Sequence, residues 1–136
     1  MAVQRRWSHE THFAAQATGA SLARAFVARH LLANDLADLV DDLQLVVSEL
    51  TTNAMLHAQT PFTVSLRAFD ATLRLEVVDG SNDDPTQVAA THLDTRGRGV
   101  TIVEALSRDW GALSRATGGK SVWAEFDIPL TYTPVL

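Results

Sequence analysis

The chain has 136 residues, which fits one domain, and an apolar fraction of 46%, enough for a hydrophobic core and too high for a disordered chain. Its net charge of -5 and scattered basic residues argue against a nucleic-acid surface, and the absence of cysteine excludes disulfides, thiolate metal sites and cysteine nucleophiles. No apolar run approaches the ~18 residues that span a bilayer, and residues 1–10 lack the apolar core of a signal peptide. We therefore expect a cytoplasmic protein without membrane contact. Ten arginines against one lysine, with abundant alanine, are typical of a G+C-rich bacterial genome.

The N-terminal half predicts an edge strand followed by two helices. Residues 5–14 alternate weakly between apolar and polar, as in an edge strand. Apolar residues recur at helical spacing over 22–31, where Ser21 is the expected N-cap. A second helix is expected from about Leu36 to Ala58, and it ends before Pro61, which cannot extend it.

The C-terminal half predicts two hairpins, separated by a polar loop and a third helix. The expected strands are 62–67 and 73–77, joined by a turn at 69–72, and 112–117 and 121–129, joined at Gly118-Gly119. Residues 80–95 are polar and aperiodic, which is typical of a lid or binding loop, and Gly99 opens a helix that ends near Trp110-Gly111. This order predicts an α+β fold, a two-layer sandwich whose mixed or antiparallel sheet is covered on one face by helices. We expect a single domain over residues 1–136 with a core of about 10–129.

Glu49 and Asn53 stand four residues apart in the second predicted helix. They share a face at the flank of the apolar stripe. A carboxylate at such a boundary can accept a proton, and an amide oxygen can bind a hard cation such as Mg²⁺. The alternative interpretation is an ordinary solvated helix flank.

Asp79 ends an apolar strand and shares the parity of Leu73, Leu75 and Val77. Its carboxylate is therefore expected on the core face of the sheet. Burial there is costly unless the charge is paired, and a ligand N–H such as an adenine amino group would pair it. The alternative is an Asp-Gly turn in which the carboxylate caps its own backbone.

Two glycine-containing segments are suited to anions. In Arg96-Gly97-Arg98-Gly99, the glycines precede a helix start, where backbone N–H groups and the helix dipole favour an anion. The spacing matches neither a Walker loop nor a dinucleotide fingerprint, and an ordinary flexible turn is the alternative. Lys120 follows Gly118-Gly119 on the expected hairpin turn, where it either meets a phosphate or is solvated.

In their order and spacing, these motifs resemble the GHKL (Bergerat-fold) ATPase superfamily. Within it, the chain is similar to the histidine-kinase-like branch of small bacterial anti-sigma factors and serine-protein kinases. Residues 47–54 with His57-Ala58 resemble the N box, 77–81 the adenine-binding segment, 96–100 the phosphate loop and 119–123 the final strand motif.

The resemblance implies a role for each motif. Glu49 would act as general base on the attacking hydroxyl, Asn53 would bind the Mg²⁺ of Mg-ATP, and Asp79 would accept the adenine amino group. Ser121 would support the adenine contact. The full set of implied nucleotide-binding residues is Asn53, Asp79, Arg96, Gly97, Arg98, Gly99, Val100, Lys120 and Ser121. A carboxylate base suits a hydroxyl nucleophile, so Glu49 favours serine phosphorylation over a detached histidine-kinase module.

By the same resemblance, the protein would be an anti-sigma factor that binds a sigma factor and phosphorylates a STAS-type anti-anti-sigma partner, as a homodimer. The sequence departs from the family pattern at several positions. Leu56 stands where a basic residue is common, Asp79-Gly80-Ser81-Asn82 lacks a second glycine, Ser121 replaces threonine, and loop 81–94 is acidic. These departures motivate an alternative, an ATP-binding partner-switch module with little or no phosphotransfer. A third possibility is an interaction domain that binds no nucleotide.

Overall fold

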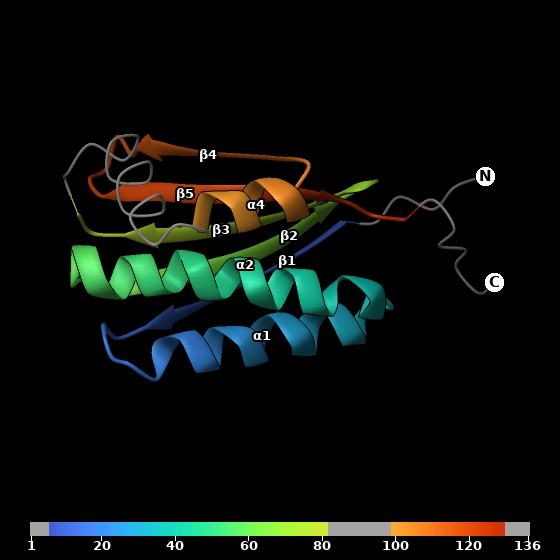
Figure 1. Cartoon of the computed structure of the whole chain (residues 1–136), viewed down its shortest axis with the longest axis horizontal. Helices are drawn as coiled ribbons and strands as arrows, with labels where there is room; N and C mark the ends of the chain where they lie inside the picture. Colours follow the sequence, from blue (N-terminus) through green and yellow to red (C-terminus); the bar gives the residue numbers. More distant parts are fainter. Residues whose placement is uncertain (1–5, 82–98, 130–136) are drawn as a thin grey trace.

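The computed structural model describes residues 6–81 and 99–129, which form a helical layer on one antiparallel sheet (Figure 1). The five strands run in the order β1-β2-β3-β5-β4, and each neighbouring pair is antiparallel. Their bounds are Arg6–Phe13 for β1, Phe62–Phe69 for β2, Thr72–Asp79 for β3, Asp109–Ser114 for β4 and Lys120–Asp127 for β5. The helical elements are α1 (Gly19–Ala33), the 3-10 turn η1 (Ala37–Leu39), α2 (Val40–Asn53), the π-helix η2 (Ala54–Ala58) and α4 (Gly99–Leu106). The predicted α+β sandwich is confirmed, with an antiparallel sheet.

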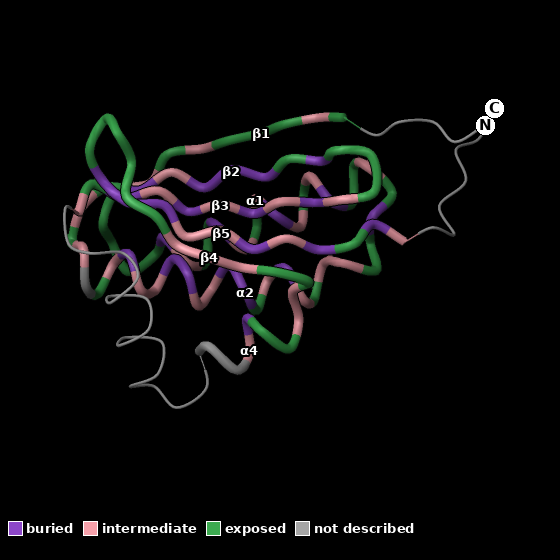
Figure 2. Tube along the Cα trace, turned by 90° about the horizontal axis from the view of Figure 1, so that it is seen from above, coloured by how far each residue is buried: buried purple, intermediate pink, exposed green. Residues whose placement is uncertain are grey.

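Alternation along the strands places one side of the sheet in the core. In β3, Leu73, Leu75 and Val77 are buried, while the residues between them are partly exposed. Among the strands, Figure 2 shows the buried positions concentrated in β2, β3 and β5, with β1 mostly exposed at the sheet edge. The weakly alternating segment at 5–14 is thus confirmed as an edge strand.

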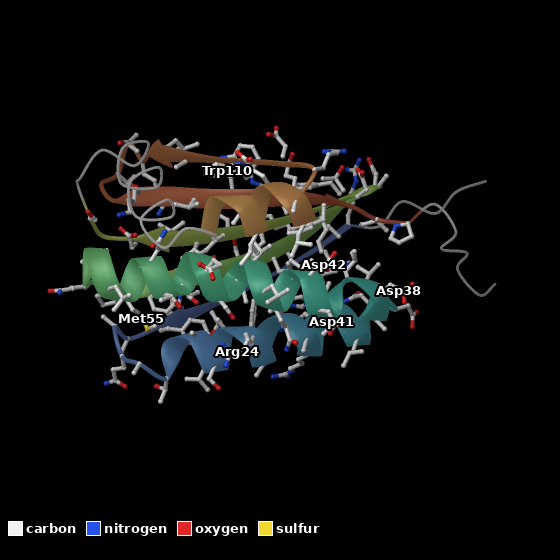
Figure 3. The ribbon with its side chains drawn as sticks, in the orientation of Figure 1. Arg24, Asp38, Asp41, Asp42, Met55 and Trp110 are labelled. Atoms are coloured by element: carbon white, nitrogen blue, oxygen red, sulfur yellow. The ribbon has the colours of Figure 1, made fainter. Side chains whose placement is uncertain are left out.

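Helices α1 and α2 pack side by side and are joined by polar contacts as well as by the core. A guanidinium nitrogen of Arg24 donates to the Ser48 hydroxyl at 3.1 Å, and the Gln44 amide donates to the Arg24 carbonyl at 3.2 Å. Asp41 and Asp42 lie in the first turn of α2, where the helix dipole favours negative charge (Figure 3). These contacts hold α2 in a defined rotation against α1.

The predicted start of α1 was wrong because of a close contact with the sheet. The helix begins at Gly19, with Thr18 at the N-cap position, and not after Ser21. A Cβ atom on Gly19 would meet the Phe62 ring at 2.9 Å, so a residue larger than glycine would require this ring to shift. The first turn therefore lies three residues earlier than side-chain capping preferences indicate.

The predicted second helix, Leu36 to Ala58, is interrupted at both ends. Asp35 has a φ of 60°, and the N–H groups of Asp35 and Leu36 donate to the carbonyls of Leu32 and Leu31. This Schellman arrangement ends α1, so that α2 begins only at Val40. At the other end, the backbone changes to a π-helix after Asn53.

The two hairpins differ from the prediction mainly in strand length. Strand β2 ends at Phe69 and strand β3 begins at Thr72, so that only two residues connect them. One of these, Asp70, has a φ of 51°. Helix α4 ends at Leu106, and Gly111, which was predicted at its end, lies in β4. A Cβ atom on Gly111 would meet the Trp123 indole at 2.8 Å, so the glycine makes room for that ring across the strand pair.

A pair of stacked histidines joins β1 to α1. The rings of His9 and His30 lie 3.9 Å apart between centroids, and Phe26 meets the His30 ring edge-on at 4.8 Å. Burial lowers the pKa of His30 below 6.5, and the charges of His9 and Arg29 lower it further. The folded state therefore favours the neutral imidazole.

This lowered pKa predicts an acid-sensitive contact. As the pH falls below about 6.5, the unfolded chain takes up a proton at His30 before the folded one does, so stability decreases. We expect His30→Phe to reduce the decrease in the urea midpoint on going from above to below this pH. His12→Gln is the control, since His12 lies on the other face of β1, where it is exposed and bonded to Thr63. An unchanged pH dependence in His30→Phe would contradict the assignment.

Among the described residues, no helix is long and apolar enough to cross a lipid bilayer.

Candidate functional site

Glu49 and Asn53 lie on one flank of α2, opposite the flank that contacts α1. At about 100° per residue, they are turned away from Gln44 and Ser48, which bond to α1. Helix α2 also contacts α4. Both side chains are half-buried, and the Oδ1 atom of Asn53 is buried without a hydrogen-bond partner among the described residues. The solvated helix flank is thus not what the structure shows at Asn53.

The π-helix η2 follows Asn53 directly and ends at Gln59 in the left-handed region, with a φ of 55°. The Gln59 N–H donates to the carbonyl of Ala54 at 3.1 Å. Single-turn π-helices are frequent at functional sites, because they displace the residues beside them from the ordinary helical register. Leu56, on this turn, is 58% exposed, so the position that often carries a basic residue presents an apolar side chain to solvent.

Asp79 ends β3 with its side chain on the core face, as its parity predicts, and the residue is only 6% exposed. The Oδ1 atom accepts a hydrogen bond from the Ser81 N–H at 2.8 Å. The next N–H, that of Gly80, donates to the Thr60 hydroxyl at 2.9 Å. Both interpretations of the sequence therefore hold: the Asp79 carboxylate accepts a hydrogen bond from its own backbone segment, and it lies on the buried core face.

Lys120 lies beside Asp79, where the sequence did not place it. It is the first residue of β5, directly opposite Asp79 in the strand register, and it is 4% exposed. Its Nζ atom lies 3.6 Å from the Oδ2 atom of Asp79. The expectation of a hairpin-turn residue was wrong, because the turn ends at Gly119 and Lys120 belongs to the strand. The parity that it shares with Ala124 and Phe126, both buried, is the sequence signal that indicates the core face.

Ser121 lies on the opposite face of the sheet from Asp79. It pairs with Val78 in the strand register, and its hydroxyl donates to the Oε2 atom of Glu76. Since successive side chains of a strand alternate between faces, the serine cannot reach the Asp79 side without a change in backbone register. The structure thus does not bring the predicted adenine-supporting hydroxyl to this site.

The predicted phosphate loop lies largely outside the described residues. Arg96, Gly97 and Arg98 belong to the part of the chain that the structure does not describe. Gly99 begins α4 as predicted, although the side chain of Val100 is likewise not described. Val103 anchors this helix in the core with no exposed surface. A role for 96–100 in binding phosphate stays a prediction.

The described residues fit a magnesium nucleotide in two respects. Mg²⁺ is commonly held by one or two protein oxygens together with phosphate oxygens and water, so the buried Oδ1 atom of Asn53 suits it as a single protein ligand. A buried carboxylate at Asp79 suits a ligand that donates an N–H. The two side chains extend from α2 and β3, which are in contact in the fold.

The family model of the histidine kinase-like ATPase domain matches residues 13–126, which is most of the chain. A search of curated proteins finds none that matches it. The matched range contains Glu49, Asn53, Asp79 and Lys120.

Proposed function

Since this chain belongs to the family of histidine kinase-like ATPase domains, we propose that it is a Mg-ATP-dependent serine kinase with an anti-sigma role. Its protein substrate would be a STAS-type anti-anti-sigma protein, its second partner a sigma factor, and its assembly a homodimer. The observation that carries the nucleotide part of the proposal is the buried, unpartnered Oδ1 atom of Asn53, one helical turn after Glu49. Such an oxygen is costly to bury unless a ligand completes its bonding.

The proposed roles follow from the position of each side chain. Glu49 accepts the proton of the attacking serine hydroxyl, since a half-buried carboxylate one helical turn before Asn53 can act as general base. Asn53 contributes its amide oxygen to the metal, and Asp79 accepts the amino group of the purine. Bound Mg²⁺ would neutralise charge on the phosphates. The chain's own contribution is therefore to orient the nucleotide and to take up one proton.

The alternative, an ATP-binding module that transfers phosphate slowly or not at all, is favoured by Leu56. Its exposed apolar side chain supplies no positive charge to the phosphates from the turn that follows Asn53. In this case the chain would still bind Mg-ATP and a partner protein. The two functions differ in phosphoryl transfer and agree in nucleotide binding.

We expect Glu49→Gln to reduce phosphoryl transfer by about 10²–10⁴-fold while Mg-ATP affinity changes only a few-fold, because a general base acts in the transition state. The measurement is transfer from γ-labelled ATP to each purified STAS-type protein encoded in the same genome, with calorimetry of Mg-ATP on both variants. Glu104→Gln is the matched control, since Glu104 is an exposed glutamate of α4.

The outcomes separate the proposals. Binding of Mg-ATP without transfer to any of these proteins supports the partner-switch module. Loss of Mg-dependent binding in Asn53→Ala supports the metal role of that residue. If the wild-type protein binds no ATP at millimolar concentration with Mg²⁺, the proposed nucleotide site is wrong and an interaction domain remains.

A further inference from the structure

The ion pair between Lys120 and Asp79 is more deeply buried than the other ion pairs of the described residues. The two side chains are 6% and 4% exposed, whereas the members of the other pairs are at least 17% exposed. Lys120 is also the only lysine in a chain with ten arginines. We infer that Lys120 is a positioning residue, which keeps Asp79 an ionised acceptor and so makes the site select 6-amino purines over 6-oxo purines. This inference rests on the proposed role of Asp79 in nucleotide binding.

The fold brings the lysine to this place through the β4–β5 turn. Gly118 and Gly119 have φ values of 96° and 84°, a conformation that side chains rarely adopt. A Cβ atom on Gly119 would overlap the backbone carbonyl oxygen of Asp79, so the turn lies directly against the end of β3. From there the strand register places Lys120 opposite Asp79 on the core face.

The pair fixes the chemical state of the carboxylate. The Ser81 N–H holds Oδ1 at 2.8 Å, and the ammonium lies 3.6 Å from Oδ2. The latter distance is longer than a direct hydrogen bond, so the attraction is mainly between the two charges. A buried carboxylate tends to take up a proton unless a cation is close. With Lys120 beside it, Asp79 stays ionised.

Ionisation determines which purine the carboxylate can recognise. An ionised carboxylate only accepts hydrogen bonds, whereas a protonated one can also donate. The 6-amino group of adenine donates, and the 6-oxo group of hypoxanthine accepts. An ionised Asp79 therefore attracts the first and repels the second, and removal of the cation would weaken this discrimination.

The test is calorimetry of Mg-ATP and Mg-ITP with the wild type, Lys120→Met and Lys120→Arg. We expect the ATP-to-ITP affinity ratio to decrease at least about tenfold in Lys120→Met, because a hydrogen bond to a charged group is lost for ATP and a repulsion is removed for ITP. Lys120→Arg retains the charge and should restore most of the ratio, which a simple loss of packing would not predict.

An unchanged ratio in Lys120→Met, together with a lost ratio in Asp79→Asn, would overturn the role of the lysine while leaving the adenine role of Asp79 intact. An unchanged ratio in Asp79→Asn would instead show that the proposed nucleotide contact is wrong.

The wild-type protein offers a second measurement that needs no variant, and so remains decisive if Lys120→Met does not fold. Labelling with ¹⁵N-lysine gives a single ammonium signal, because the chain has one lysine. We expect Mg-ATP to shift this signal strongly and Mg-ITP to shift it less. An ammonium signal that stays constant while calorimetry records Mg-ATP binding would overturn the inference.

Discussion

Asp79→Asn is expected to weaken Mg-ATP binding by about 10- to 100-fold and to lower the free energy of unfolding by about 3–5 kcal/mol. The binding effect follows from the lost charge and the altered donor pattern. If the Ser81 N–H keeps the remaining oxygen, the new amide nitrogen faces the ammonium of Lys120 and the purine amino group, donor against donor. The stability effect follows because Lys120, which is 4% exposed, loses the carboxylate with which it pairs.

Binding and stability can be separated with a double variant. Calorimetry of Mg-ATP and urea unfolding would be measured for Asp79→Asn and for Asp79→Asn combined with Lys120→Met. Removal of both charges should recover most of the stability but not the affinity, because an unpaired buried cation no longer remains.

Asp127→Asn is the control for the loss of one carboxylate charge. Asp127 forms an exposed pair with Arg108 at 3.0 Å at the end of β5, where such pairs contribute at most about 1 kcal/mol. Wild-type ATP affinity in Asp79→Asn would contradict the assigned role of Asp79.

Local patterns in the sequence predicted the parts of the fold that depend on alternation and helical periodicity. The core-facing position of Asp79 followed from its parity with Leu75 and Val77, and the structure confirms it. The α+β sandwich followed from the order of elements, since antiparallel hairpins and early helices pack in few ways. These features are encoded within a few residues of each position.

The features that the sequence did not predict depend on contacts between distant segments. Gly19, at the start of α1, lies against the Phe62 ring, and Gly111, in β4, lies against the Trp123 indole, with no room for a Cβ atom at either position as these rings stand. Ordinary capping and turn preferences contain no information about such partners, which lie 43 and 12 residues away by residue number (62 − 19 and 123 − 111).

The sequence predicted which residues belong to the candidate site better than it predicted where their side chains lie. Glu49 and Asn53 share a flank of α2 as their spacing indicates. Lys120, and not Ser121, lies beside Asp79, because Lys120 belongs to β5 and shares the parity of the buried Ala124 and Phe126, whereas Ser121 lies on the opposite face. The alternation was present in the sequence, but the strand pairing that places Lys120 opposite Asp79 is a contact between distant segments.

Gly119→Ala is expected to lower the free energy of unfolding more than the same substitution at Gly118, its neighbour in the β4–β5 turn. Its φ of 84° costs a residue with a side chain about 1–2 kcal/mol. In addition, the new Cβ atom would overlap the backbone carbonyl oxygen of Asp79, whereas Cβ atoms in proteins essentially never come closer than 3.0 Å to such a neighbour. Overpacking of a tight contact adds about 1–3 kcal/mol. Because the clash is with backbone, no side-chain rotation relieves it.

Gly118→Ala is the matched control, since it separates the cost of the backbone conformation from the cost of the clash. Gly118 has a φ of 96°, but a Cβ atom there meets nothing within 4 Å. It should therefore lose only about 1–2 kcal/mol, and urea unfolding of both variants would measure the difference. Equal losses would show that the turn can move away from Asp79 at no cost. A larger loss in Gly119→Ala, accompanied by weaker Mg-ATP binding, would show that the close approach of the turn to the end of β3 maintains both the fold and the position of the carboxylate.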